Sequence, residues 1–380
     1  MNLSKYHVMR RKLFFLLICL ALISSIQAQY TTDKIVGQKN EHIRDSLKTV
    51  DYPYLLPIWG KKVTQQGFKL PKSAGVSAQY FWQESDVIIS NLQIGFNNGP
   101  KYNLDEIVRF EEAKTSTNAI NVRPDIWLFP FLNVYAIFAK SNTSTAINAG
   151  VWVPDSTDWH EILTIDTKAE FDATTFGFGF TPTVGVGGFF LALDMNVAWS
   201  DISALEEPAF SFIFGPRIGK NITFKDPERS LAIWAGGFRV KLNSGTNGSL
   251  NTSDLFPVDE WGQKIDVGYS KVAESQQKVD AWWSGLTPAD QRNPINVAKH
   301  EAANAALATA GGILDRASQA VTNGASSTIQ YSLDKKPKEM WNFIIGTQFQ
   351  LNRSWMLRAE YGFLGARKQF IGGLQYRFNL

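Results

Sequence analysis

Cysteine is almost absent from this sequence: Cys19 is the single one among 380 residues. Because Cys19 lies in an apolar run near the start of the chain, we expect neither a disulfide nor a thiolate metal site in the rest of the chain. Histidine is also scarce, with four residues, and the formal net charge is only +3. So small a charge gives no electrostatic footprint for nucleic acid, and we expect no nucleic-acid partner.

Long apolar runs are missing beyond residue 26, so no later segment has the ~20 apolar residues of a transmembrane helix. At the start, Lys5, Arg10, Arg11 and Lys12 precede the apolar run 13–26. A basic segment, a short apolar run and a small residue near a cleavage site are typical of a secretory signal peptide. We therefore expect a cleaved signal peptide over 1–28, with cleavage after Ala28, and a periplasmic N-terminal segment over 29–70.

Motifs of glycosidases, proteases and phosphoryl-transfer enzymes are missing as well. Outer-membrane enzymes that modify lipids mostly need a histidine base near a serine. Beyond the signal peptide the sequence has only His42, His160 and His300, and none is in an expected strand beside a serine. We expect no catalytic residue, no metal site and no cofactor. A solvated loop explains the acidic surroundings of His160 better than a metal site, and a lipid-modifying hydrolase is kept as the alternative function.

Alternating strands are what the sequence has in abundance. The runs 341–351, 355–363 and 370–380 each carry one apolar and one mostly polar face, and the two faces do not exchange. A strand of about 11 residues rises ~3.3 Å per residue, so at a tilt of ~40° it covers roughly 28 Å of height. That height is close to the thickness of the hydrocarbon core of a membrane. These strands therefore fit a membrane better than a soluble sandwich.

Aromatic side chains on the apolar faces lie near the strand ends, as in the two aromatic girdles of a transmembrane barrel. The tryptophans assigned to these girdles are Trp82, Trp199, Trp341 and Trp355. The pattern over 71–380 resembles that of bacterial outer-membrane β-barrel proteins. The resemblance implies a Gram-negative-type outer membrane, with lipids, lipopolysaccharide and the barrel assembly machinery as partners. It also implies that Tyr376, Phe378 and Leu380 form the assembly signal, although this family commonly ends on phenylalanine rather than leucine.

The expected fold class is all-β: a transmembrane antiparallel up-and-down β-barrel of about ten strands, in which the last strand pairs with the first. Twelve strands is the alternative, in which "VIISNLQIGF" and 104–114 add a hairpin. Residues 243–340 interrupt the barrel as a partly helical insert, with Thr287 as N-cap, Pro288 at N1 and Asp290 at N3 of one helix. An even strand count puts both termini in the periplasm, so the insert leaves from the extracellular side. It either enters the lumen, caps the mouth or is a solvated loop.

Charged residues on the lumen-facing side of the expected strands are the most informative set. They are Arg123, Asp125, Asp194, Arg217, Arg239, Lys241, Arg358, Glu360 and Arg377. Six are basic and three acidic. We predict a lumen cluster, with Arg358 about opposite Gln375, that is made of Arg123, Asp125, Arg217, Arg358, Glu360 and Arg377.

Two interpretations of these charges compete. They form an ion-pair network that fills a structural or surface barrel, or they line a narrow, weakly anion-selective pore for small solutes. A ten-stranded barrel is only about 20 Å wide, so side chains fill most of its interior. We therefore favour a largely filled, slightly basic lumen.

Overall fold

The computed structural model describes residues 45, 49, 51–66, 68–155, 158–186, 189–226, 228–242, 245–252, 258–323 and 327–380. The expected signal peptide and Cys19 lie outside these residues. None of the helices in the described part of the chain is both long enough and apolar enough to cross a membrane.

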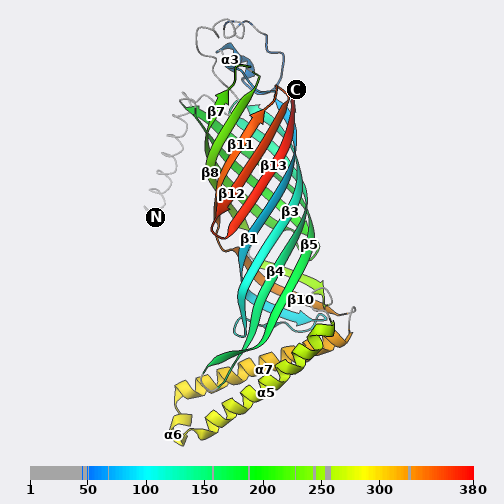
Figure 1. The fold of residues 1–380 in the computed structure, drawn as a ribbon, viewed down its shortest axis with the longest axis vertical. Coiled ribbons are helices and arrows are strands. Elements are labelled where there is room, and N and C mark those ends of the chain that lie inside the picture. The colour runs from blue at the N-terminus through cyan, green and yellow to red at the C-terminus, as the bar shows by residue number, and fades with distance from the viewer. Residues whose placement is uncertain are drawn as a thin grey trace, which may run out of the picture.

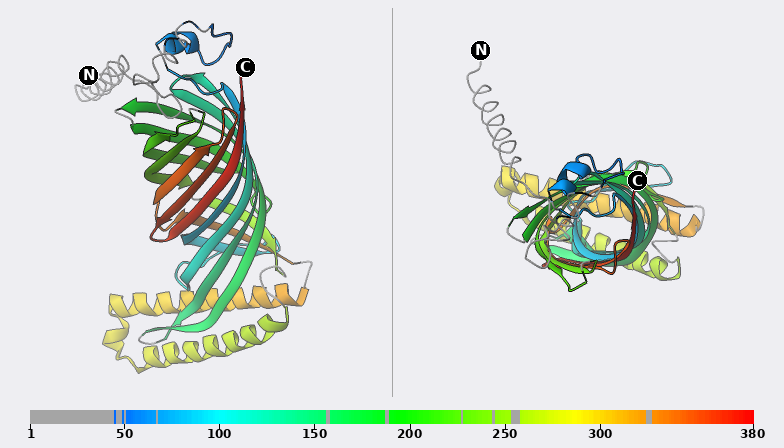
Figure 2. Two further views of the ribbon diagram at one scale, coloured as in Figure 1. Left: turned by 45° about the horizontal axis from the view of Figure 1, so that its top comes forward. Right: turned by 90° about the horizontal axis from the view of Figure 1, so that it is seen from above.

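Ten antiparallel strands close into a barrel in the order β13-β12-β11-β8-β7-β6-β5-β4-β3-β1, with β1 returning to β13 (Figures 1 and 2). Their bounds are β1 Ala74–Phe96, β3 Val108–Phe129, β4 Leu132–Pro154, β5 Trp159–Val186, β6 Phe189–Ile202, β7 Ala209–Thr223, β8 Ser230–Leu242, β11 Trp341–Gln350, β12 Trp355–Leu364 and β13 Arg367–Phe378. The closing ladder pairs Ala74 with Phe378 and continues to Ser85 and Arg367. The expected fold class, strand count and closure are therefore confirmed.

The alternative of twelve strands is wrong. Its extra hairpin consists of the continuations of two barrel strands, because β1 runs on to Phe96 and β3 begins as early as Val108. A bulge between Ser90 and Gln93 bends β1 without ending it, and Asn91 at this bulge has a φ of 54°.

Four strands extend far beyond the barrel on the side away from the C-terminus. Strands β1, β3, β4 and β5 have 23, 22, 23 and 28 residues. Beyond the point where β13 leaves β1, strand β10 (Thr328–Pro337) takes its place, and β9 (Gly245–Asn251) pairs with β10. The short β2 (Tyr102–Asn103) also pairs with β1. We call this sheet of β9, β10 and the outer parts of β1, β3, β4 and β5 the extension.

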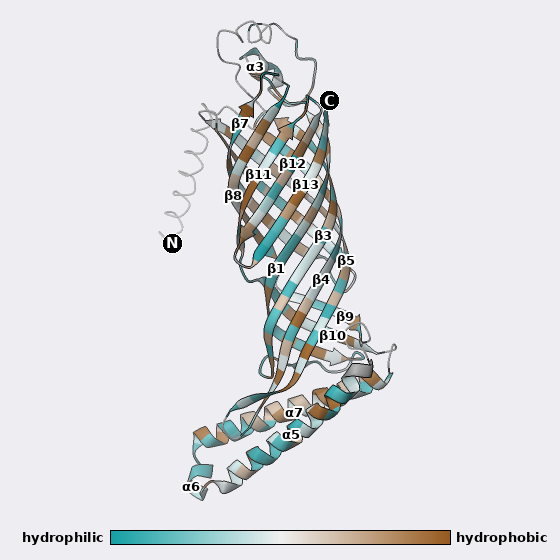
Figure 3. Ribbon diagram, in the orientation of Figure 1, coloured by the Kyte–Doolittle hydropathy of each residue, from teal (hydrophilic) through white to brown (hydrophobic). Residues whose placement is uncertain are grey.

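The outward face of these strands changes from apolar to polar at a common level. Figure 3 colours the same strands by the hydropathy of each residue. Along β4, Phe138 is followed on the same face by Lys140 and Asn142, and its neighbour β5 changes in register with it, since Phe138 pairs with Phe176 and Asn142 with Asp172. On β1 the change comes between Trp82 and Glu84, and on β3 between Ile120 and Asn118. Apolar residues in contact with lipid and polar residues in contact with water explain this change. It places one boundary of the membrane at this level.

Two long antiparallel helices, α5 (Val258–Gly285) and α7 (Pro294–Asn323), lie across the far end of the extension (Figures 1 and 2). They pack on its inner face, where Val279 and Leu307 join a buried cluster with Val153 and Ile162. In the described part of the 243–340 insert, the helices therefore cover the extension and β9 and β10 belong to it, and none of these elements enters the barrel lumen. The short α6 (Pro288–Gln291) between the helices begins as expected, since the Thr287 side chain accepts a hydrogen bond from the Asp290 N–H.

The opposite end of the barrel is partly covered by the segment just before β1. This segment carries helix α3 (Gly60–Gln65), and the backbone N–H of Ile58 donates to the carbonyl of Leu128 at 2.9 Å. The Trp59 ring lies 5.1 Å from that of Phe129, at the tight turn between β3 and β4. The described end of the 29–70 segment is thus attached to the barrel rim beside the C-terminus.

Candidate functional site in the barrel lumen

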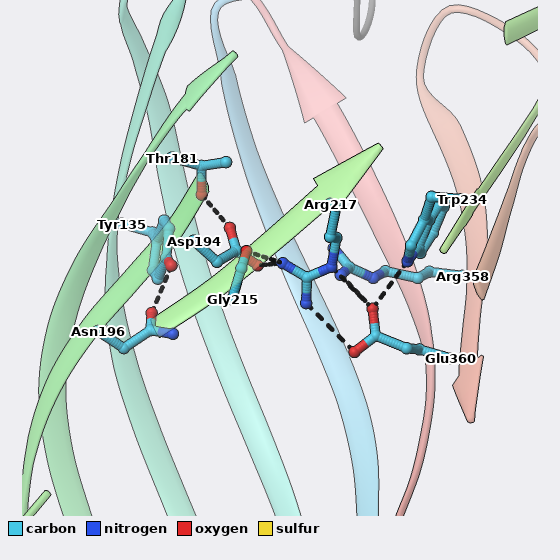
Figure 4. A network of polar contacts seen from close by, with 9 residues as sticks. All are labelled: Tyr135, Thr181, Asp194, Asn196, Gly215, Arg217, Trp234, Arg358 and Glu360. Atoms are coloured by element: carbon cyan, nitrogen blue, oxygen red, sulfur yellow. Dashed lines mark hydrogen bonds and ion pairs between the residues drawn. The ribbon is translucent and has the colours of Figure 1, made fainter. Parts of the chain in front are cut away.

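One buried ion-pair network crosses the lumen between β6, β7, β8 and β12 (Figure 4). The Arg217 guanidinium donates to both oxygens of Glu360, at 3.0 and 3.2 Å, and pairs with Asp194 on its other side. Arg358 Nη2 and the Trp234 indole N–H also donate to Glu360 Oε2, at 3.2 and 3.0 Å. Because Glu360 is only 1% exposed and bonded to three side chains, it is the centre of this network. We call it the Glu360 network.

A second network lies nearer the termini. Asp125 Oδ2 accepts from Arg377 Nη1 at 3.0 Å and from Asn133 Nδ2 at 2.7 Å. Gln375 donates to the other oxygen of Asp125, and Arg377 Nε donates to the carbonyl of Lys72 at 3.0 Å. We call it the Asp125 network. It ties β13 to β3 across β1, which supports the closing ladder from inside.

Arg123 is placed differently from the other predicted cluster residues. Its guanidinium carbon lies 3.3 Å from the centroid of the Tyr135 ring, a cation–π contact. No carboxylate among the described residues lies within 4.0 Å of its nitrogens. The structure thus brings five of the six predicted residues into two ion-pair networks and leaves Arg123 between them.

The predicted register of β12 and β13 is wrong by two residues. Arg358 lies opposite Gly373, and Gln375 lies opposite Met356. The sequence suggested a loop of about five residues, but the hairpin turns through Gly365 and Ala366 alone, where Gly365 has a φ of 51° that glycine adopts without strain. The tighter turn moves Arg358 away from Arg377 and into the Glu360 network.

The predicted orientation of β8 is also wrong. Trp341, on the lipid-facing side of β11, pairs with Arg239, so Arg239 and Lys241 point outward. Ala232 and Trp234 point into the lumen, where they pack with Phe190 and Ala192 in a buried apolar cluster. The lumen is therefore less basic than the sequence suggested, with Arg123, Arg217, Arg358 and Arg377 against Asp125, Asp194 and Glu360.

Two members of the Glu360 network were missing from the predicted cluster. Asp194 belongs to the inward-facing charges of the sequence, and the alternation of β6 was sufficient to add it. Trp234 gave no such signal. Both faces of β8 are apolar around it, with Leu231 and Ile233 on one side and Ala232 on the other. Only the pairing with β7 and β11 decides which face is inside.

The residues predicted for the girdles and for the assembly signal lie on the outer surface. Trp199, Trp341 and Trp355 are about two-fifths exposed, and Trp82 is partly buried. Trp355 lies against Tyr376 with ring centroids 4.8 Å apart, at the end that carries the termini, whereas Trp341 begins β11 at the other end. Tyr376 and Leu380 are also exposed, and Phe378 pairs with Ala74 in the closing ladder.

A histidine and a serine do meet in the extension, which the sequence did not lead us to expect. His160 Nε2 lies 3.0 Å from the hydroxyl of Ser275 on α5, and His160 Nδ1 lies 3.9 Å from Asp155. Ser275 is fully buried and donates its hydroxyl proton to the carbonyl of Lys271 at 2.8 Å. His160 must then donate from Nε2, which is the wrong tautomer for a general base. The contact fastens α5 to the β4–β5 hairpin.

Among the described residues, no group of three or more histidine, cysteine, aspartate or glutamate side chains is arranged to hold a metal ion. The arginines of the lumen donate hydrogen bonds and cannot accept them. The lumen therefore favours contact with anions over contact with cations.

No protein-family model matches this sequence, and no curated protein matches it. Solved structures match at low identity. The β domain of a Bordetella autotransporter is 9% identical with a TM-score of 0.29, and the match covers 80% of this chain and 100% of that one. The translocator domain of an autotransporter from Neisseria meningitidis is 9% identical with a TM-score of 0.31, covering 90% and 94%. A toluene transporter from Ralstonia pickettii is 8% identical with a TM-score of 0.27, covering 82% and 90%.

Proposed function

We propose that this chain, which has the fold of a bacterial outer-membrane β-barrel, is a non-enzymatic surface protein whose barrel is a closed anchor for the extension and its helices. The observation that carries the proposal is the Glu360 network, because its residues span the lumen between β7 and β12. The side chains of Arg217 and Glu360 are 5% and 0% exposed. Such burial leaves little room for a continuous water path between them.

The location follows from physical arguments about the barrel. An apolar outer face on all ten strands needs lipid around it, and closed barrels of this kind occur in outer membranes. With an even number of strands, both termini lie in the periplasm and the extension lies outside the cell. Under this proposal the surrounding partners are outer-membrane lipids and lipopolysaccharide. The barrel assembly machinery reads Tyr376 and Phe378 on β13 and Leu380 just beyond its end.

The helices are the part of the molecule that reaches furthest from the membrane. At ~1.5 Å per residue, the 28 residues of α5 and the 30 of α7 are each more than 40 Å long. A helix pair of this length, packed on the sheet of the extension, suits contact with partners outside the cell.

Conductance in planar bilayers tests the closed anchor. We expect the full-length protein to insert without steady conductance steps. A variant in which a short glycine-rich linker replaces 253–326 serves as the matched control. Its ends already meet, since the Thr252 N–H donates to the Ser327 carbonyl at 2.9 Å. This variant should insert and stay closed as well, because the networks lie in the barrel. Regular conductance steps from the full-length protein would refute the closed anchor.

A narrow channel for small solutes is the second candidate, favoured by one observation. A cavity of ≈ 70 Å³ separates the two networks, so the lumen is not uniformly filled. Conductance steps that grow when Glu360 is replaced by alanine would favour the channel. A lipid-modifying enzyme is disfavoured by the buried, hydrogen-bonded state of Ser275.

A further inference from the structure

We propose that the cavity between the two lumen networks is a binding site for one small monovalent oxyanion, of the carboxylate or phosphate class. The cavity measures ≈ 70 Å³ and is bounded by residues of both networks and by Arg123. A water molecule needs about 10–15 Å³ of such volume, so there is room for roughly five waters. One acetate or phosphate ion occupies a comparable space.

Hydrogen-bond donors without acceptors point into this cavity. Arg377 is 4% exposed, and its Nη2 has no hydrogen-bond partner. Arg123 contacts the Tyr135 ring, and it forms no ion pair with a carboxylate of the described residues. Both arginines line the cavity, and Arg377 Nη2 is a buried donor there without an acceptor. Buried donors of this kind need an acceptor, and a charged donor needs it most.

The two carboxylates of the cavity wall are already engaged. Asp125 accepts from Arg377, Asn133 and Gln375. Asp194 accepts from Arg217 and Thr181. Neither carboxylate can turn toward Arg123 without leaving the partners that now hold it. A charged acceptor for Arg123 must therefore come from outside the cavity wall.

The charge count distinguishes an anion from water. Arg123, Arg217, Arg358 and Arg377 of the cavity wall carry four positive charges. Asp125 and Asp194 of the wall, together with Glu360 that pairs with Arg217 and Arg358, carry three negative ones. One positive charge is left in a confined space surrounded by lipid, where its attraction to an anion is much stronger than in water. Water can accept the hydrogen bonds, but it cannot neutralise this charge.

Guanidinium groups select the class of anion. Their forked N–H groups match the paired oxygens of carboxylates and phosphates better than a spherical halide. The volume excludes larger acids. Occupancy of the site does not require an open channel. An anion can enter during a transient opening of the barrel, or it can become trapped when the barrel folds.

Unfolding temperatures of the full-length protein in detergent, read from heat-modifiable gel mobility, test the proposal. Sodium acetate and sodium phosphate should each raise the unfolding temperature saturably at constant ionic strength. Sodium gluconate, a carboxylate too large for the cavity, should not. Gln79 lines the cavity, so Gln79→Glu places a carboxylate there. This variant should unfold at a higher temperature without anion and lose the response to acetate.

Arg123→Gln removes the excess charge and should weaken the acetate response at least tenfold in concentration. Lys140→Gln, on the water-exposed outer face of β4, is the matched control and should keep the full response. The site is refuted if no small oxyanion raises the unfolding temperature, which is the result expected for water alone. It is equally refuted if Gln79→Glu or Arg123→Gln responds as the unsubstituted protein does. Conductance is not a readout in this experiment, so its outcome is separate from that of the closed anchor.

Discussion

The barrel and the extension share four strands, but the apolar residues of these strands are on opposite faces in the two regions. On β4, Val134 and Phe138 face outward in the barrel, whereas Ala149 and Val153 face inward in the extension and are buried. The inside of the barrel holds charged networks, and the inside of the extension holds an apolar core that the helices complete. The solvent outside decides which face is apolar: lipid around the barrel, water around the extension. A change of the apolar face within one strand therefore marks the membrane boundary.

Preventing the closure of the barrel should have the largest effect on membrane insertion. Deleting 376–380 removes Tyr376 and Phe378 from the closing ladder, together with the ion pair of Arg377 and Asp125. An unclosed sheet edge in lipid leaves backbone groups unpaired, so we expect no heat-modifiable protein in the membrane fraction. Asn379→Ala, which keeps the closing ladder and all three residues of the expected assembly signal, is the control and should insert. Normal insertion of the shorter chain would show that these residues are dispensable for closure and assembly.

Removing the central carboxylate of the lumen comes next. Glu360→Ala leaves Arg217 and Arg358 to share Asp194, and breaking a buried pair in this way costs about 3–5 kcal/mol. The unfolding temperature read from gel mobility should fall clearly. Glu170→Ala breaks an exposed pair with Lys168 on the extension and should change nothing measurable. Equal stability of the two variants would mean that the lumen charges are solvated.

A mutation that creates a cavity in the core of the extension should destabilise that region alone. Leu307 is 2% exposed in the cluster that holds α7 on the strands, and Leu→Ala at such sites costs about 2–5 kcal/mol. We expect limited proteolysis to cut the helices of Leu307→Ala while the barrel keeps its heat-modifiable mobility. Val267→Ala, at a half-exposed position of α5, is the control. Loss of barrel mobility in Leu307→Ala would show that the two regions unfold as one unit.

Lys335 gives the extension a dependence on pH. It lies on β10 with its Nζ 3.3 Å from the Thr145 hydroxyl, and burial lowers its pKa to about 8. An unfolded lysine has a pKa of about 10.4, so between these values the unfolded chain binds more protons and stability rises with pH. Below pH 8 both states are protonated, and the cost of burying the charge is constant.

Lys335→Met should remove the rise between pH 8 and 10.5 and stabilise the extension at pH 7 by about 1–3 kcal/mol. Thermal unfolding followed by circular dichroism at several pH values measures both effects. Lys336→Met, at the exposed neighbouring position, should leave the rise in place. An unchanged rise in Lys335→Met would assign it to another group.

The sequence predicts the barrel well because alternation is strict where strands pass through lipid. It fails where both faces are apolar, as at Leu231 to Ala235 of β8, since parity alone cannot then choose the inner face. It also fails at the β12–β13 hairpin, where the residues around Gly365 suggest a longer loop than the two-residue turn that forms.

The extension escapes prediction for a different reason. Its strands continue the alternation, but with the apolar residues on the other face, as at Ala149 and Val153 of β4. When the apolar residues change faces within one strand, the sequence pattern looks like that of a loop or of the start of another strand. Pairs such as Arg377 with Asp125 depend on register across several strands, which no local pattern provides.

Labelling of single cysteines on intact cells tests the two-region account most directly. The sequence has Cys19 as its only cysteine, so a background measured on the unsubstituted protein is easily subtracted. Ala136 and Ala146 lie on the same outer face of β4, at the barrel level and on the extension. A maleimide that cannot cross membranes should label Ala146→Cys rapidly and leave Ala136→Cys unlabelled until the membrane is dissolved. Equal labelling of both positions, or protection of Ala146→Cys, would contradict the membrane boundary between them. It would also contradict the location of the extension outside the cell.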